Sequence, residues 1–307
     1  MTRGRFAPSP TGALHLGNLR TALLALCFAR HDGGSLLIRV EDLTTPPSSG
    51  HDAGGTERAQ LDDLAGLGIT ADEPVVRQSG RLDLYRGVLE GLTRRGLTYP
   101  CFCTRREIEQ ASAAPHGPSP EGAYPGTCAH LSTAEVRRLE ASGRVPALRL
   151  AAARTRVVVA DRLAGSVDAE VDDFVVWRRD GFPAYNLSVV VDDIDQSVDQ
   201  VVRGADLLDT TPRQALLYDL LGHDRPEYVH VPLVVGADGQ RLAKRHGATN
   251  LPELVALGWS SGTVLSLLAG SIGVLDSGTP MGAEDVARLF DPEHLSREAW
   301  VFEAPAR

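Results

Sequence analysis

The sequence has few cysteines, few aromatic residues and no long apolar run. Its 307 residues include four cysteines, too few for a disulfide framework. We assign Cys27, on the apolar face of a predicted helix, to core packing. The most apolar stretch, Val264 to Leu275, has about 12 residues, whereas a membrane-spanning helix needs about 20. The N-terminal residues are not followed by the apolar stretch of a secretory signal peptide. We therefore expect a cytoplasmic protein without a membrane segment.

Lysine is nearly absent too. Of the 31 basic residues, Lys244 is the only lysine. A bias toward arginine explains the general pattern, but it makes the position of this lysine informative, because ammonium and guanidinium groups differ in shape and hydration. The net charge of -9 argues against a general nucleic-acid coat. It leaves open RNA binding by a local basic face.

The N-terminal region predicts an α/β fold. A short strand at Arg5–Ala7, turn residues at Pro8–Gly12 and a helix from Leu16 to Ala29 follow one another. A strand at Ser35–Val40 then ends at Glu41. This β-α-β order predicts a parallel sheet with a right-handed crossover, as in a Rossmann-like core.

A different pattern occupies residues 99–184. It contains three of the four cysteines, a loop rich in alanine, proline, glycine and serine at 111–126, and a helix capped by Ser132 and Glu135. Strand-like pieces follow at 147–150, 156–160 and 174–178. We interpret this region as an insertion in the sheet domain.

A sequence pattern typical of alternating strands and helices returns after the insertion. We expect a strand at Leu187–Val191 with an acidic turn at Asp192–Asp195, a strand ending at Gly204, a helix starting at Thr211, a strand at Tyr228–Val235 and a helical tail from Leu251. The predicted domains are a Rossmann-like first half at 1–98, the insertion at 99–185, the second Rossmann-like half at 186–248 and the small helical C-terminal tail at 249–307.

The first motif is the string from Pro8 to Asn18, between the first strand and the first helix. Backbone N–H groups at a helix start favour a bound anion, and Gly17 lets a phosphate or a planar group approach closely. His15 can donate to a phosphate oxygen. For His15 alone a satisfied surface histidine is the simpler interpretation, but the whole string in this position favours a binding site.

The second motif is Arg241-Leu242-Ala243-Lys244-Arg245, which follows a strand and a turn. A lysine on a loop can neutralise charge that builds on a transferring phosphoryl group. A solvated basic loop is the alternative. The single lysine of the chain lies here, however, which indicates a specific requirement for an ammonium group.

Together the two motifs resemble the signatures of class I aminoacyl-tRNA synthetases, His-Ile-Gly-His and Lys-Met-Ser-Lys-Ser. The strings similar to the glutamyl and glutaminyl branch of that class are 5–12, 190–193, 202–208 and 241–247. The resemblance covers roughly residues 3 to 250. Arg241 and Ala243 depart from the second signature, whereas Lys244 matches it.

Cys101, Cys103 and Cys128 are candidates for a zinc site. Three thiolates with one oxygen or nitrogen donor suit tetrahedral Zn²⁺, and His116 and His130 are available as the fourth ligand. Buried reduced cysteines are the alternative interpretation.

More specifically, the chain resembles the glutamyl-Q tRNA(Asp) synthetase family, short paralogues of glutamyl-tRNA synthetase. That family has a Cys-x-Cys…Tyr-x3-Cys zinc site, which implies Tyr124 as the fourth ligand beside the three cysteines. Val189 stands where true glutamyl enzymes typically have asparagine. The sequence ends too soon after Lys244 for an anticodon-binding domain, so we expect none.

The resemblance implies tRNA-independent activation of glutamate by ATP to glutamyl-adenylate and pyrophosphate. Glutamate is then transferred to the queuosine base in the anticodon of tRNA(Asp). The implied partners are glutamate, ATP with Mg²⁺ and tRNA(Asp) carrying queuosine. The implied cofactor is structural Zn²⁺, and we expect a monomer.

The resemblance also implies site residues. The catalytic set is His15, Gly17 and Lys244, and the ATP site adds Asn18 and Arg241 to these three. The residues implied for glutamate are Arg5, Phe6, Ala7, Pro8, Ser9, Glu41, Tyr185 and Arg203. Among them, Glu41 would bind the ammonium group, and the two arginines would each meet a carboxylate through charge-assisted bonds.

Other functions remain open from the sequence. A truncated or discriminating glutamyl-tRNA synthetase would charge an acceptor end, and Val189 argues against it. A non-catalytic RNA-binding module derived from a synthetase has no use for an intact set of phosphate-stabilising residues such as His15 and Lys244. A redox or zinc protein accounts only for the cysteines.

Overall fold

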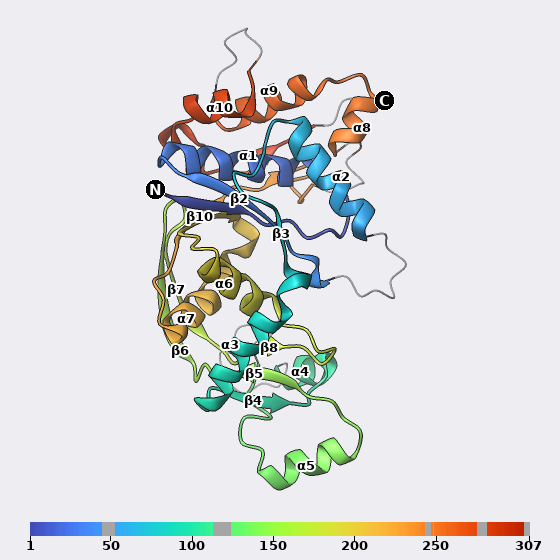
Figure 1. Cartoon of the computed structure of the whole chain (residues 1–307), viewed down its shortest axis with the longest axis vertical. Helices are drawn as coiled ribbons and strands as arrows, with labels where there is room; N and C mark the ends of the chain where they lie inside the picture. Colours follow the sequence, from blue (N-terminus) through green and yellow to red (C-terminus); the bar gives the residue numbers. More distant parts are fainter. Residues whose placement is uncertain (45–52, 113–123, 243–246, 248, 275–280, 304–307) are drawn as a thin grey trace.

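The computed structural model describes residues 1–44, 53–112, 124–242, 247, 249–274 and 281–303 (Figure 1). The strands are β1 (Arg3–Phe6), β2 (Ser35–Val40), β3 (Val76–Arg77), β4 (Thr98–Cys101), β5 (Ala147–Leu150), β6 (Thr155–Asp161), β7 (Gly165–Val171), β8 (Phe174–Trp177), β9 (Gln200–Gly204), β10 (Glu227–Val231), β11 (Val234–Val235) and β12 (Trp300–Val301). The helices are α1 (Leu16–His31), α2 (Ala53–Gly66), α3 (Leu82–Arg94), α4 (Arg105–Ser112), α5 (Thr133–Ala141), α6 (Tyr185–Asp195), α7 (Thr211–Leu221), α8 (Leu251–Ala256), α9 (Ser261–Ser271) and α10 (Ala283–Leu289).

The core of the molecule is a seven-stranded sheet in the order β3-β2-β1-β9-β10-β6-β7. Every neighbouring pair is parallel except β6 and β7. Successive residues of β9 and β10 pack into different hydrophobic clusters: Val201 and Tyr228 into one, Val202 and Val229 into the other. The sheet is therefore covered on both faces, as parallel sheets usually are. The α/β class predicted from the sequence is confirmed.

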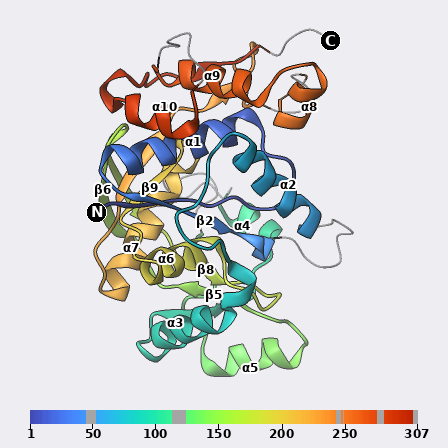
Figure 2. The same ribbon diagram turned by 45° about the horizontal axis from the view of Figure 1, so that its top comes forward.

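The helices form layers on the two faces of this sheet (Figures 1 and 2). One face carries α1, against which α9 and α10 pack, and the other face carries α6 and α7. Arg20 joins α1 to the tail, because its buried guanidinium donates to the carbonyl of Pro232 and to the hydroxyl and carbonyl of Ser271. The tail is thus part of the core packing.

The predicted insertion contributes to two sheets. Strands β4, β5 and β8 form a separate antiparallel sheet, at the end of the molecule far from α9 and α10 (Figure 1). Strands β6 and β7 instead extend the central sheet, because β6 pairs with β10. The helix predicted at Ser132 is α5, and the predicted capping box of Ser132 with Glu135 is present.

Two local predictions were wrong. Leu187–Val191 was expected to be a strand and lies in helix α6, which starts after the extended residue Ala184. A short apolar run does not distinguish a buried strand from a buried helix, and here burial on both sides of the helix removes the periodic signal. The expected turn Asp192–Asp195 is the last turn of the same helix, with Asp192 and Asp193 buried.

The tail contains more than helices. After α10 the chain returns as β12, which pairs with β11. The amide of Trp300 donates to the carbonyl of Leu233, and the amide of Phe302 to that of Val235. These contacts hold the segment that leads into the second motif. In the part of the chain that the structure describes, no helix combines the length and apolar character needed to cross a membrane.

Candidate functional site

A cavity of about 550 Å³ opens at the carboxyl ends of β1, β2 and β9. This edge of a parallel sheet is where such folds bind ligands. Every described residue predicted for glutamate or ATP lines it, namely Arg5, Phe6, Ala7, Pro8, Ser9, His15, Gly17, Asn18, Glu41, Tyr185, Arg203 and Arg241. Lys244 lies outside the described residues. The fold therefore gathers segments that are far apart in the sequence around one pocket.

His15 caps the first helix. Its Nδ1 accepts from the amide of Asn18 at 3.3 Å, and its own amide donates to the Asn18 side chain at 3.1 Å. A Cβ at Gly17 would lie 2.9 Å from the His15 ring, so glycine is needed for this arrangement. Burial, followed by the nearby Arg241, lowers the pKa of His15. A neutral ring that accepts through Nδ1 keeps an Nε2–H available as a donor.

The loop between β1 and α1 is fixed from two sides. The buried side chain of Gln60, on α2, donates to the carbonyls of Ser9 and Gly12 at 3.0 and 2.6 Å. The amide of Glu41 donates to the carbonyl of Pro8 at 2.9 Å. These bonds hold the loop backbone at the rim of the cavity, although sequence reasoning did not identify Gln60.

The segments beside the second motif lie against the first. The amide of Leu16 donates to the carbonyl of Thr249 at 2.7 Å, and His15 forms a bridge with Asn250. On the other side of the motif, Arg241 pairs with Asp206 at 2.6 Å, and both line the cavity. Of the described residues on either side of Lys244, Arg241 therefore lines the cavity, and Thr249 and Asn250 lie against the start of α1.

Glu41 is a buried acid at the base of the cavity. Burial raises the pKa of Glu41 to about 7, even though Arg39 and Arg5 oppose the shift. Its carboxylate lies 3.6 Å from the Arg39 guanidinium. Because Arg39 also pairs with other acids, Glu41 is only partly compensated, which suits it to bind a cation.

A buried charge network lies beneath the cavity. Arg39 is fully buried and lies 2.7 Å from Asp193 and 3.5 Å from Asp192. Asp193 is also 3.5 Å from Arg5. Asp192 accepts from three further side chains, those of Gln78, Arg81 and Tyr85. The network ties α6 to β1 and β2, and the sequence analysis had placed its two aspartates in a turn.

Comparison with known proteins agrees with this geometry. The family described as "tRNA synthetases class I (E and Q), catalytic domain" matches residues 1–304. This chain belongs to that family. A glutamyl-Q tRNA(Asp) synthetase of Nocardia farcinica is 52% identical over 97% of this chain and 92% of the relative. One from Symbiobacterium thermophilum is 46% identical over 97% and 95% of the two chains.

Solved synthetase structures share the fold. The crystal structure of a glutamate tRNA ligase from Elizabethkingia meningosepticum in complex with its amino acid is 26% identical, with a TM-score of 0.82. The match covers 99% of this chain and 67% of that one. The synthetase fold therefore extends over the whole described chain, including the tail.

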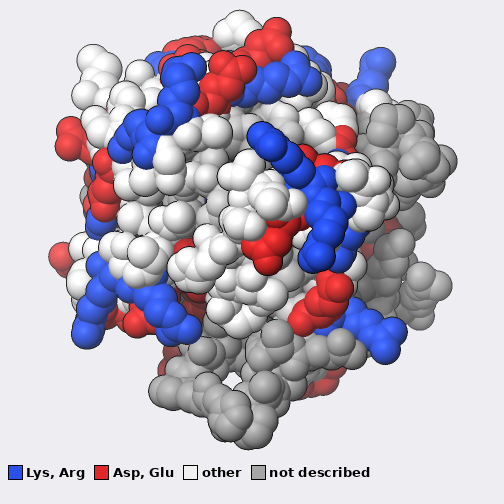
Figure 3. Space-filling model, turned by 90° about the horizontal axis from the view of Figure 1, so that it is seen from below, with Lys and Arg blue, Asp and Glu red and all other residues white. Residues whose placement is uncertain are grey.

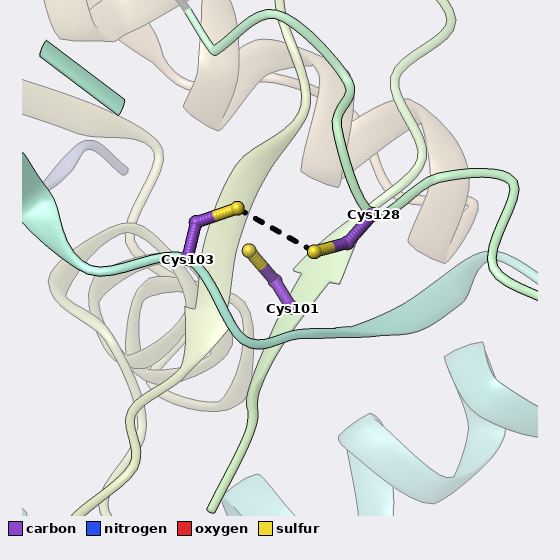
Figure 4. A group of neighbouring side chains, drawn as sticks. All are labelled: Cys101, Cys103 and Cys128. Atoms are coloured by element: carbon purple, nitrogen blue, oxygen red, sulfur yellow. Dashed lines mark hydrogen bonds between the residues drawn. The ribbon is translucent and has the colours of Figure 1, made fainter. Parts of the chain in front are cut away.

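The three cysteines predicted for zinc lie together in the insertion (Figure 4). Their sulfur atoms are within 4.8 Å of one another, and Cys103 Sγ is 3.5 Å from Cys128 Sγ. The Tyr124 hydroxyl lies 3.4 Å from Cys101 Sγ. His130 is not part of this group among the described residues, and His116 lies outside them. Cys27 is buried in the main core, as predicted.

The surroundings of Cys101 favour its thiolate. Burial raises the pKa of Cys101, but its hydrogen bonds with Tyr124 and Arg149 outweigh burial, so the net shift is downward. Arg149 Nε donates to Cys101 Sγ at 3.2 Å. Burial, together with the neighbouring Cys128, raises the pKa of Cys103 to about 11. This donor set fits a thiolate-binding divalent metal, which would relieve the crowding of the remaining thiols.

Proposed function

We propose that the protein activates glutamate with ATP and then transfers it to the queuosine base in the anticodon of tRNA(Asp). The observation that carries the proposal is the pocket, in which buried arginines and one buried acid surround a cavity at the class I signature. The names of relatives up to 52% identical over nearly the full chain support the same substrates.

The pocket offers complementary groups for glutamate. Glu41 binds the ammonium group, and Arg5 and Arg203 bind the carboxylates. Tyr185 donates its hydroxyl, and the backbone from Phe6 to Ser9 forms one wall. The α-carboxylate of glutamate attacks the α-phosphorus of ATP, the adenylate forms and pyrophosphate leaves.

The ATP site lies at the start of α1. His15, Gly17 and Asn18 hold the phosphates, with the Nε2–H of His15 as a donor. Arg241 and Lys244 stabilise charge on the transferring phosphoryl group and on the departing pyrophosphate, and Mg²⁺ accompanies ATP as a counter-charge. These residues supply position and charge stabilisation and no covalent nucleophile.

The insertion and the tail serve the second substrate. We assign residues 99–185 to tRNA contact, with Zn²⁺ held by Cys101, Cys103, Cys128 and Tyr124 as a structural ion. The insertion end of the molecule presents arginines beside acidic side chains (Figure 3). Such local cations suit a single-stranded loop, whose splayed bases and backbone are contacted individually. The protein acts as a monomer in the cytoplasm.

The test is glutamate-dependent exchange of pyrophosphate into ATP, with and without tRNA. Exchange without tRNA is the expected result. The second step is then measured as transfer of labelled glutamate to tRNA(Asp) with queuosine, against the same tRNA with guanosine at that position. Exchange only in the presence of tRNA would favour an acceptor-charging enzyme, and no exchange in either case would favour a non-catalytic RNA-binding module.

A further inference from the structure

Arg203 differs from the other buried arginines of the pocket. It is the penultimate residue of strand β9 and is 4% exposed. Arg39 has three carboxylates within ion-pair distance and Arg5 has one. Among the described residues, no carboxylate lies within 4.0 Å of the Arg203 guanidinium, although the charge is just as buried. A buried charge without a partner is costly, so its partner is expected to arrive with the ligand.

Three neutral acceptors hold the Arg203 side chain. Nε donates to His230 Nε2 at 2.9 Å, one terminal nitrogen donates to Gln214 Oε1 at 2.7 Å, and the other donates to Thr211 Oγ1 at 2.8 Å. A guanidinium has five N–H groups. One N–H therefore remains on each terminal nitrogen, which matches the two oxygens of a carboxylate.

The strand pairing places His230 beside Arg203. The two residues are register partners on the parallel strands β10 and β9. His230 Nδ1 lies 2.6 Å from Asp161 Oδ2, and Asp161 also accepts from the amides of Leu163 and Ala164. The Asp161 carboxylate therefore accepts the hydrogen bond from the Nδ1–H of His230. The lone pair of Nε2 then faces Arg203.

Burial and two nearby arginines keep His230 neutral. Burial is the main cause that lowers the pKa of His230, and Arg203 and Arg5 lower it further, whereas Asp161 raises it. The His230 side chain is fully buried. A neutral imidazole accepts the hydrogen bond from Arg203 without cancelling its charge, which a carboxylate in the same place would do.

We propose that His230, oriented by Asp161, is a positioning residue for glutamate binding: it holds the Arg203 guanidinium through a neutral acceptor, so that the arginine's charge and its two free N–H groups are left for a substrate carboxylate. This inference rests on the proposed function. It adds two residues, His230 and Asp161, that do not touch the reacting atoms. It also explains why a buried cation is surrounded by neutral groups.

The test compares two replacements of His230 in the full-length protein. His230→Leu removes the acceptor and keeps an apolar volume, and we expect the KM for glutamate to rise about tenfold or more, while kcat and the KM for ATP change less than about threefold. His230→Gln returns an acceptor oxygen near the Nε2 position, and we expect a KM for glutamate within about threefold of the original protein.

Two further variants complement the His230 replacements: one tests the charge of Arg203 in another way, and the other is a control. Gln214→Glu places a carboxylate on Arg203 without removing an acceptor, and it should also raise the KM for glutamate, about tenfold. Tyr228→Phe is the matched control. It lies on the same strand, its hydroxyl has no hydrogen-bond partner among the described residues, and its removal should leave both KM values unchanged.

The outcomes separate the two proposals. If the original protein shows no glutamate-dependent exchange with or without tRNA, the proposed function fails and this inference fails with it. If the original protein is active, the inference alone is overturned by either of two results: a His230→Leu protein with the original KM for glutamate, or His230→Leu and His230→Gln proteins impaired to the same extent.

Discussion

The affinity for glutamate should follow the ionisation of Glu41. Burial raises the pKa of Glu41 to about 7, and only the ionised carboxylate attracts the ammonium group of the substrate. With a pKa near 7, about one-tenth of the molecules are ionised at pH 6 and about nine-tenths at pH 8. We therefore expect the KM for glutamate to be roughly tenfold higher at pH 6 than at pH 8.

The ionisation of Glu41 should also affect the stability of the protein without glutamate. The pKa of Glu41 is higher in the folded state than the ordinary value of 4.5 expected in the unfolded chain, so its contribution to stability is full below pH 4.5 and is lost as the pH rises through about 7. This difference in pKa between the folded and the unfolded state corresponds to about 3 kcal/mol of stability lost at pH 8. Glu41→Gln removes this cost, and Arg39 keeps Asp192 and Asp193 as partners.

Two assays check this reasoning. Exchange kinetics between pH 6 and 8 give the KM for glutamate, and urea unfolding at pH 8 gives the stability of Glu41→Gln, which should gain up to about 3 kcal/mol while losing glutamate binding. Asp63→Asn is the control for glutamate binding. Burial also raises the pKa of Asp63, to about 6, but Asp63 does not line the cavity. A KM that does not change with pH, or a Glu41→Gln protein less stable at pH 8, would refute the argument.

Three further predictions concern other parts of the molecule. Cys103→Ser should lower the zinc content found by metal analysis, whereas Cys27→Ala should not; equal content in both would remove the cysteine site. Lys244→Met should slow glutamate-dependent exchange about a hundredfold while glutamate still raises Tm, and an unchanged rate would exclude the loop from the reaction. Asp192→Asn should lower the free energy of unfolding by about 3–5 kcal/mol; urea unfolding that shows a much smaller loss would mean that Arg39 does not depend on this charge.

The features that sequence predicts well here are local. The cap at Ser132 depends on residues three positions apart, and the helix that starts at Thr211-Pro212 has proline where its missing N–H costs nothing. The first motif lies between β1 and α1 because the turn residues Pro8–Gly12 after a strand lead into a helix. Each of these signals is complete within a few residues of the chain.

The features that sequence missed depend on distant partners. The valines of α6 favour a strand locally, but packing against α3 and α7 makes the segment a helix. Nothing near His230 in the sequence indicates Arg203 or Asp161, which the pairing of β10 with β9 and β6 brings to it. A buried arginine with neutral partners becomes visible only when the side chains around it are known.

The pocket contains two poorly compensated charges of opposite sign, Glu41 and Arg203, and glutamate carries the complement of both. A ligand that lacks one complement should therefore show a different pH dependence. Glutarate has the two carboxylates but no ammonium group, so ionised Glu41 repels it and protonated Glu41 does not. Between pH 6 and 8, glutamate should bind more tightly as the pH rises and glutarate more weakly, which calorimetry can measure for both. Parallel trends for the two ligands would mean that the group that titrates does not face the ammonium site.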